Sequence, residues 1–402
     1  MTSTSKPLDG IKVLDFTAIV LGPLATLMLA DMGADVIKVE PPEGDPIRNA
    51  AASRHRGMGS IHLALNRNKS SLAVDLKTPD GREILQRLVR WADVVVHNMR
   101  EGAAQQLGID YASLKAVNPG IVHCVASGFG EKSPRTGDPA VDDIVQAGSG
   151  LASLLLEHTG HAHFVPSLLA DKVSGLFLCN AVMAALLNRA KTGAGQSTTV
   201  PMYETMATFT LLEHLGGTAF PADPGSPGYG RLTTAHRRPM HTADGIMAMT
   251  PYSKKHWQAF FHASGFPEHA DDPRVTDPKK RNDCIAELYE LLLTILPTRP
   301  TADWMRIARE LGIPASPVNS LQDLVSAPDL YDQGFLARTP HPSEGEVLAI
   351  SPVGPLLGGT LGETGPAPRI GEHSVAILQD LGFAPEAIDA WRASGVITAP
   401  DA

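Results

Sequence analysis

Runs of consecutive apolar residues alternate with amphipathic stretches through the first part of the chain. The apolar runs at 11–17, 35–40, 93–97 and 121–126 have the length of strands, and the stretches at 23–32 and 78–91 have helical spacing. Buried strands that alternate with helices are typical of a parallel sheet covered on both faces. The pattern therefore predicts an α/β fold with a Rossmann-like order of elements.

The turn after the first strand lacks the fingerprint of a dinucleotide site. It reads 18-AIVLGP-23, and no G-x-G-x-x-G follows the strand. Those glycines let the backbone approach a pyrophosphate closely. The sequence therefore argues against NAD.

A longer apolar run lies at 173–187, where only Ser174 and Asn180 are clearly polar. It is shorter than the roughly 20 apolar residues that a membrane span needs, so it predicts a buried helix and no membrane partner. Asp171 falls in the first turn of this helix, where free N–H groups and the helix dipole favour an anion. Two interpretations stay open for Asp171, a simple helix cap and a functional carboxylate.

The pattern changes after this helix. A helical stretch at 203–215 leads into a turn-rich, basic segment at 216–239, and short strands and helices follow to about 325. We therefore expect a large domain over 1–200, a smaller inserted α+β domain over 225–325, and a return of residues 335–402 to the large domain.

Composition narrows the classes of partner. The 402 residues are 43% hydrophobic and 19% charged, as in ordinary globular proteins, and the formal charge of −9 argues against nucleic acid. The three cysteines (Cys124, Cys179 and Cys284) show no C-x-x-C spacing and suggest no disulfide framework. The first residues contain no basic, apolar signal sequence, so the cytoplasm is the expected compartment.

Positive charge is concentrated in one segment. Ten Lys or Arg and four Asp or Glu lie between Arg48 and Arg100, which gives 10 − 4 = +6 within a chain of −9. Part of this charge fits a solvated helix face. The part between Arg54 and Lys77 predicts a basic patch for a small polyanion such as a nucleotide pyrophosphate.

Several catalytic motifs are absent from the sequence: the G-x-S-x-G elbow, H-E-x-x-H and the P-loop. His158, His161 and His163 resemble a metal cluster, but no Asp or Cys accompanies them at ligand spacing, so no metal is expected. The carboxylate of Asp171 remains, and carboxylates form covalent intermediates in some enzymes.

Several further segments carry a resemblance to a known family. They are 7-PLDGIKVLDFT-17, 22-GPLATLMLADMGADVIKVEPPEGDPIR-48, 68-NKSSLAVDLKTPDG-81, 97-HNMREGAAQQLG-108, 118-NPGIVHCVASGFG-130 and 188-NRAKTGAGQ-196. Over essentially its whole length the sequence resembles the class III CoA-transferases, the family of formyl-CoA:oxalate and carnitine CoA-transferases.

The resemblance implies a function and an assembly. Asp171 matches the family's nucleophile, which forms an aspartyl anhydride with the acyl group and then an aspartyl-CoA thioester. Coenzyme A or acyl-CoA would be a substrate together with a small carboxylic acid, with no permanently bound cofactor. The family also implies an interlocked homodimer.

The same resemblance assigns CoA contacts, which are Ile19, Val20, Val74, Lys77, Asn98, Met99 and Arg100. Two departures from the family pattern matter. Gln106 stands where many members have a phosphate-binding Arg or Lys, so Arg100 or Arg54 would take that role. Val141 replaces an aromatic residue before the pair Asp142 and Asp143, which predicts a wider pocket near the thioester.

A third departure concerns the acceptor acid. Oxalate-type members have a glycine-rich flap ahead of the segment that matches 239–245. Here that place holds Tyr229, Arg231, His236, Arg237 and Arg238. This loop is either a basic surface loop or an Arg fork that recognises the second carboxylate of a dicarboxylic acid.

Two other functions are alternatives for this sequence. An alpha-methylacyl-CoA racemase resembles this chain but carries a Gly-His-Asp-x-Asn-Tyr motif, whereas 137-GDPAVDDIVQ-146 contains no His. A noncatalytic CoA-binding protein would be marked by an idle Asp171.

Overall fold

The computed structural model describes residues 6–222, 225–351 and 365–400. The chain separates into two compact units. The first comprises Met1–Ser149, Phe164–Phe209 and Pro328–Ala402, and the second comprises Gly150–His163 and Thr210–Ala327. The segments 225–325 and 335–402 each fall inside one unit, whereas the segment 1–200 contributes residues 150–163 to the second.

The first unit is built on a seven-stranded sheet in the order β12-β3-β2-β1-β4-β5-β6. Its strands are β1 (Lys12–Phe16), β2 (Asp35–Glu40), β3 (Lys69–Val74), β4 (Val94–His97), β5 (Val122–Ser127), β6 (Gln196–Pro201) and β12 (Ile397–Thr398). All neighbours pair in parallel except β12, which is antiparallel to β3. The order 3-2-1-4-5-6 is that of the doubly wound fold, so the predicted α/β class is confirmed.

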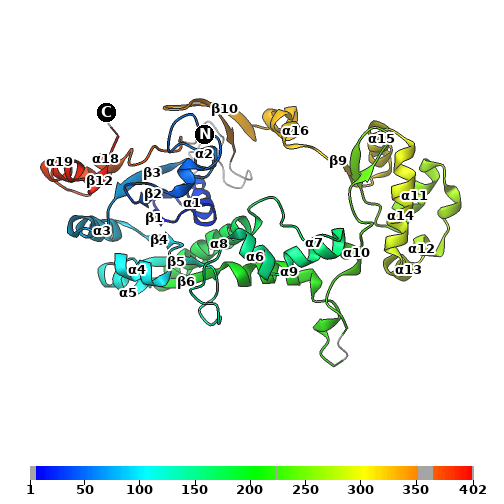
Figure 1. The fold of residues 1–402 in the computed structure, drawn as a ribbon, viewed down its shortest axis with the longest axis horizontal. Helices are drawn as coiled ribbons and strands as arrows, with labels where there is room; N and C mark the ends of the chain where they lie inside the picture. Colours follow the sequence, from blue (N-terminus) through cyan, green and yellow to red (C-terminus); the bar gives the residue numbers. More distant parts are fainter. Residues whose placement is uncertain (1–5, 223–224, 352–364, 401–402) are drawn as a thin grey trace. The chain divides into compact units, whose positions relative to one another are not determined.

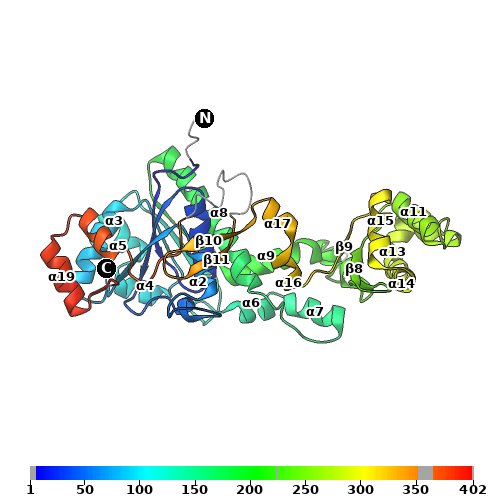
Figure 2. The ribbon, with the colours of Figure 1, turned by 90° about the horizontal axis from the view of Figure 1, so that it is seen from above.

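Helices cover both faces of this sheet (Figures 1 and 2). The helices α3 (Pro79–Trp91), α5 (Tyr111–Val117), α18 (Ser374–Asp380) and α19 (Pro385–Ser394) share one apolar core with the strands. The helices α1 (Leu21–Asp31) and α8 (Leu169–Thr192) pack together on the other face. This unit also contains α4 (Glu101–Leu107), α6 (Asp142–Gly148) and residues 202–209 of α9 (Met202–His214).

Helix α8 differs from its prediction in length and in burial. It has 24 residues, because the helix continues beyond the 15-residue apolar run into the more polar flanks 169–172 and 188–192. The sequence had suggested that this helix is too short to span a membrane. The observed helix is long and apolar enough for a span, so its length does not exclude one. Its buried face packs on β5, β6 and α1 as a core helix does, while Leu176, Phe177 and Leu187 are exposed in the single chain.

The predicted basic patch is wrong in part. Arg67 and Lys69, which belong to the predicted patch at 54–77, are buried and paired with Asp31 and Asp15, and Arg48, which precedes the patch, is buried and paired with Glu40. These acids lie before Arg48 in the sequence and therefore did not enter the charge count. Buried charges need such partners to offset the loss of water, so these three cations are not free to bind a polyanion.

The second unit has its own core of apolar and aromatic side chains. A three-stranded sheet of β7 (Met240–His241), β8 (Ile246–Met249) and β9 (Ala315–Pro317) contributes Met240, Met247 and Met249 to this core. The helices α11 (Lys254–Ser264), α14 (Ile285–Ile295) and α15 (Thr301–Leu311) supply most of the other core residues, including Trp257 and Trp304.

Candidate active site

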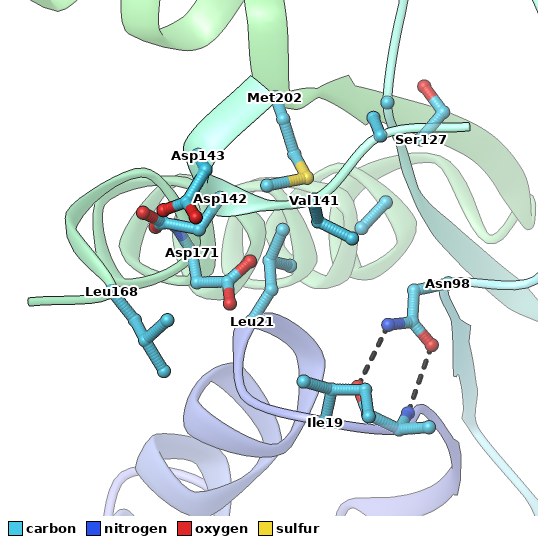
Figure 3. Close-up of a pocket in the computed structure, with 14 residues that line it drawn as sticks. Ile19, Leu21, Asn98, Ser127, Val141, Asp142, Asp143, Leu168, Asp171 and Met202 are labelled. Carbon is cyan, nitrogen blue, oxygen red and sulfur yellow. Dashed lines mark hydrogen bonds between the residues drawn. The ribbon is translucent and has the colours of Figure 1, made fainter. Parts of the chain in front are cut away.

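A cavity of about 280 Å³ lies at the carboxyl ends of β1 and β4, where the strand order of the sheet reverses. Ligands of doubly wound sheets bind at this point. The cavity is lined by Ala18, Ile19, Leu21, Asn98, Ala126, Ser127, Gly128, Ala140, Val141, Asp142, Asp143, Leu168, Asp171 and Met202 (Figure 3). Within the described part of the chain, the ionisable side chains that line it are the three aspartates, and most of the other lining side chains are apolar.

Asp171 enters this cavity from the first turn of α8. The helix cap is Leu168, and no side chain makes a capping hydrogen bond, so the interpretation of Asp171 as a simple cap is wrong. Asp171 is 9% exposed, and no hydrogen bond from the described residues adds to burial and the charge of Asp142 in setting the pKa of its carboxyl. A buried carboxylate without a partner is costly, which marks it as a functional candidate.

Close packing fixes where α8 starts relative to α1. Gly175, one turn after Asp171, lies against the first residue of α1. A Cβ at position 175 would be 2.7 Å from the carbonyl oxygen of Leu21, which is closer than side-chain carbons come to neighbouring atoms. Glycine therefore lets α8 approach α1 closely, and this approach places Asp171 beside Leu21 (Figure 3).

Asp142 organises the start of α8. Its Oδ1 accepts the backbone N–H of Asp171 at 3.0 Å, and its Oδ2 accepts Nε2 of Gln146 at 2.5 Å. The Oε1 of Gln146 in turn accepts the N–H of Val165 at 2.9 Å. This network holds the segment before α8 and keeps a second carboxylate next to the first.

The environment of Asp171 changes its acidity. Burial raises the pKa of the Asp171 carboxyl to about 6, and the negative charge of Asp142 adds to this shift. Both causes disfavour the charged form. The carboxylate that a nucleophilic role requires is therefore present above about pH 6, and protonation removes it at lower pH.

This shift leads to a prediction on pH dependence. Asp142→Asn removes one of the two causes, so the pKa of Asp171 falls and the acidic limb of the rate profile moves to lower pH. The limb stays above the ordinary value of 3.8 because burial, the larger cause, remains. The measurement is kcat/KM against pH for the wild type and the variant. Asp143→Asn is the matched control, since Asp143 lines the same cavity without shifting Asp171; a limb that moves equally in both variants contradicts the assignment.

A second cavity of about 300 Å³ adjoins the first and shares Asn98, Ala126, Ser127 and Gly128 with it. Met99, Arg100, Tyr111 and Phe129 are among its other lining residues. It also contains a buried histidine pair, in which Nε2 of His97 lies 2.9 Å from Nε2 of His123. Burial lowers the pKa values of these rings to about 3 and about 4, so both are neutral near pH 7.

The two cavities bring together some of the predicted CoA contacts and not others. Ile19 and Asn98 line the first cavity, and Asn98, Met99 and Arg100 line the second. Val20 and Val74 are 4% and 2% exposed in the core, and Lys77 is an exposed residue that lines neither cavity.

The two alternatives for the phosphate contact differ in their surroundings. Arg54 donates to the backbone oxygen of Glu344, and it lines neither of these cavities. Arg100 is exposed and lines the second cavity together with Met99. Gln106 is exposed on α4. The geometry therefore favours Arg100 over Arg54.

The loop predicted to recognise the acceptor lies in the second unit. Tyr229 precedes the short helix α10 (Gly230–Thr233), which contains Arg231. Arg237 and Arg238 are exposed, and neither forms an ion pair with another residue of the described ranges. Their guanidinium groups are therefore available to an anion.

Sequence reasoning missed the network around Asp142 and the histidine pair. In the sequence, the pair Asp142 and Asp143 served only to locate Val141. The signal for the network was the spacing of Asp142 and Gln146, because side chains four residues apart meet on one face of a helix. The described ranges contain no group of three or more His, Cys, Asp or Glu side chains placed to hold a metal ion.

Comparisons with known proteins agree with this geometry. A family model described as CoA-transferase family III matches residues 8–374. A succinate–glutarate CoA-transferase of Agrobacterium fabrum is 29% identical over 390 residues, covering 95% of this chain and 97% of that protein. A probable fatty acyl-CoA transferase of Mycobacterium tuberculosis, Rv3272, is 30% identical over 94% of this chain and 98% of its own. The crystal structure of Rv3272 matches with a TM-score of 0.79 at 28% identity, over 92% of this chain and 99% of that one.

Proposed function

Because this chain belongs to the CoA-transferase family III, we propose that it moves CoA from an acyl-CoA donor to a carboxylic acid by covalent catalysis at Asp171. The observation that carries the proposal is the carboxylate of Asp171, which is buried, unpartnered and placed on the wall of an apolar cavity. No other acid in that cavity combines these properties, since Asp142 is hydrogen-bonded and Asp143 is exposed.

The reaction proceeds in four exchanges. The Asp171 carboxylate attacks the thioester carbonyl, the C–S bond breaks, and a mixed anhydride and CoA thiolate result. The thiolate attacks the Asp171 carbonyl of the anhydride, which releases the donor acid and leaves an aspartyl-CoA thioester. The acceptor carboxylate attacks this thioester and expels the thiolate, giving a second anhydride. The thiolate then attacks the acceptor's carbonyl, which yields the new acyl-CoA and regenerates the Asp171 carboxylate.

The surroundings of Asp171 suit these steps. The dipole of α8 favours negative charge at its N-terminal end, on the carboxylate and on each tetrahedral oxyanion, although the N–H of Asp171 itself is already bonded to Asp142. The apolar wall made by Ile19, Leu21, Val141 and Leu168 keeps water from the anhydride and the thioester, which water would hydrolyse. The second cavity, which shares Asn98 with the first, is the proposed site for part of the CoA molecule.

The acceptor that we propose is a dicarboxylic acid, as for the relatives named for succinate and glutarate. Among the described residues, those that line the Asp171 cavity include three acids and no Lys or Arg. A second carboxylate on the acceptor would therefore find no counter-charge there, and its partner must come from a residue outside this cavity. The same apolar wall suits an aliphatic acid, so a monocarboxylate is the second candidate.

One screen tests the function and separates these candidates. Succinyl-CoA is offered with a panel of mono- and dicarboxylic acids, and each new acyl-CoA is read by mass. Formation of glutaryl-CoA or another dicarboxylic acyl-CoA above the monocarboxylic products supports the proposal. A panel that yields only free CoA, or nothing, contradicts it.

The loop 229–238 leads to a prediction on acceptor choice. Arg237→Gln and Arg238→Gln are each expected to lower kcat/KM for a dicarboxylate by about 10- to 150-fold, because a lost charge-assisted contact costs about 1.5–3 kcal/mol. The monocarboxylate should change little, since it has no second charge for an Arg fork to bind. Equal losses for both acids, or no loss for either, would contradict this prediction and indicate that the loop is a basic surface loop.

The assembly that we propose is a homodimer, in the cytoplasm. The exposed side chains of α8 support a partner: Leu176 and Leu187 are 46% and 64% exposed and lie three turns apart on one face, with Phe177 beside the first. Sedimentation at micromolar concentration tests the dimer, and a single species of 42.6 kDa would contradict it.

A further inference from the structure

Ile19 has a backbone conformation that its side chain disfavours. Its φ is 71°, in the left-handed region, where a β-branched residue is a genuine outlier. The residue lies between the end of β1 and the start of α1, and it lines the same cavity as Asp171. Such conformations persist only where the surrounding structure over-determines them.

Asn98 holds the residue before Ile19 by both of its backbone polar groups. Its Oδ1 accepts the N–H of Ala18 at 2.9 Å, and its Nδ2 donates to the carbonyl of Ala18 at 2.9 Å (Figure 3). The side-chain amide is thereby occupied by protein backbone. Asn98 is the first residue after β4, so the adjacency of β1 and β4 in the sheet creates this clamp.

A second, buried clamp holds the residues on either side of Ala18. Asp45 Oδ1 accepts the N–H of Ile19 at 3.1 Å, and Lys38 Nζ donates to the carbonyl of Thr17 at 2.9 Å. Asp45 Oδ2 and Lys38 Nζ are joined by a 2.9 Å ion pair, and the two residues are 3% and 0% exposed. Backbone groups of three consecutive residues, 17 to 19, are therefore fixed.

The two clamps explain how the strained backbone conformation of Ile19 is stabilised. The position of the Ile19 side chain explains why the chain has isoleucine there instead of glycine. Glycine would adopt the backbone conformation of residue 19 without cost. The chain uses glycine at position 22, where a Cβ would lie 2.2 Å from Cβ of Thr17, yet it retains Ile at position 19. The Ile19 side chain is 42% exposed and contributes little to the core, so what it contributes is the apolar wall of the cavity.

We propose that Asn98 and Asp45 are positioning residues, which hold the strained turn so that Ile19 forms a rigid apolar wall that keeps water from the reacting carbonyl. This inference rests on the proposed function. It reassigns the Asn98 amide from a ligand of CoA to a clamp on the protein's own backbone. Loosening the clamp should therefore raise hydrolysis relative to transfer, an effect that a general loss of stability would not produce.

The test uses succinyl-CoA as the donor and glutarate as the acceptor, with Asn98→Ala, Ile19→Gly, Ile19→Ala and the double variant Asn98→Ala/Ile19→Gly. The ratio of hydrolysis to transfer is expected to rise about 10-fold or more in Asn98→Ala and in both Ile19 variants. Ile19→Gly should melt at a higher temperature than Ile19→Ala, because only glycine relieves the strain. Asn98→Ala should lower Tm less in the Ile19→Gly background than in the wild type.

Asn118→Ala is the matched control. Its Nδ2 also joins two backbone carbonyls, those of Val89 and Ala92, at 3.1 and 2.8 Å, but it lines neither cavity. It should lower Tm and leave the ratio unchanged. Additive changes in Tm for Asn98 and Ile19, or an unchanged ratio in Asn98→Ala, would overturn the inference. Absence of transfer by the wild type with any acceptor would overturn the proposed function instead, and the Tm cycle would still decide the clamp.

Discussion

Asp171→Ala is expected to abolish CoA transfer, with a loss of at least about 10³-fold in kcat, while CoA binding stays nearly intact. The reason is that, in the proposed mechanism, each covalent intermediate is an acyl derivative of this one carboxylate, and among the described residues that line the cavity no other carboxylate is both buried and without a hydrogen bond. Alanine removes the nucleophile and leaves α8 packed on α1 through Gly175. Transferase assays beside calorimetric titration with CoA measure the two effects.

Intact mass gives a more direct reading of the same hypothesis. The wild type incubated with succinyl-CoA should gain a species heavier by CoA less one water, which is the aspartyl-CoA thioester, and Asp171→Ala should not. Asp303→Ala is the control, since Asp303 is an exposed acid in the first turn of α15. Turnover retained in Asp171→Ala, or lost equally in Asp303→Ala, would sink the assignment.

Asp15→Ala is expected to destabilise the protein by about 3–5 kcal/mol, the largest effect on stability that we predict. Asp15 is 0% exposed and pairs with Lys69 at 3.0 Å. Burial by itself raises the pKa of Asp15, but Lys69, Lys38 and hydrogen bonds from Thr17 and Thr26 outweigh it and hold the pKa far below 3.8. Removing this carboxylate leaves a buried ammonium without its partner.

The sign of the pH dependence follows from the direction of this shift. An acid with a lowered pKa in the folded state stabilises the fold at pH values above its unfolded pKa, and this contribution is lost as the pH falls below about 4. Urea unfolding at pH 7 measures the destabilisation. Glu310→Ala, which breaks the exposed pair with Arg306, should cost less than about 1 kcal/mol; a similar cost in both variants would contradict the argument.

Much of the fold could be predicted because its strands are continuous apolar runs. The predicted strand at 35–40 coincides with β2, and those at 93–97 and 121–126 agree with β4 and β5 to within one residue at each end. The strand β6 could not be found in this way, since Gln196, Ser197, Thr198 and Thr199 are polar. It lies at the edge of the sheet, where polar side chains are tolerated.

The site was predictable at Asp171 and less so around it. A lone acid at the head of an apolar helix stands out in the sequence, whereas Asp15 and Lys69 are charges inside two different strands that pair with each other. Their pairing depends on the order of the strands, which periodicity does not contain. The contact of Asn98 with Ala18 has the same origin, because 80 residues separate them and only the adjacency of β1 and β4 joins them.

The antiparallel strand β12 has a consequence for how the protein is made. It pairs with the edge of β3, and α18 and α19 fill the core beside it, yet the ribosome synthesises all three after the whole second unit. The nascent first unit therefore waits with the edge of β3 uncovered and with part of its core unfilled. The second unit, whose core is its own, can fold during that interval. A truncation after the second unit would thus remove β12, α18 and α19, and the first unit would lose one strand of its sheet and part of its core.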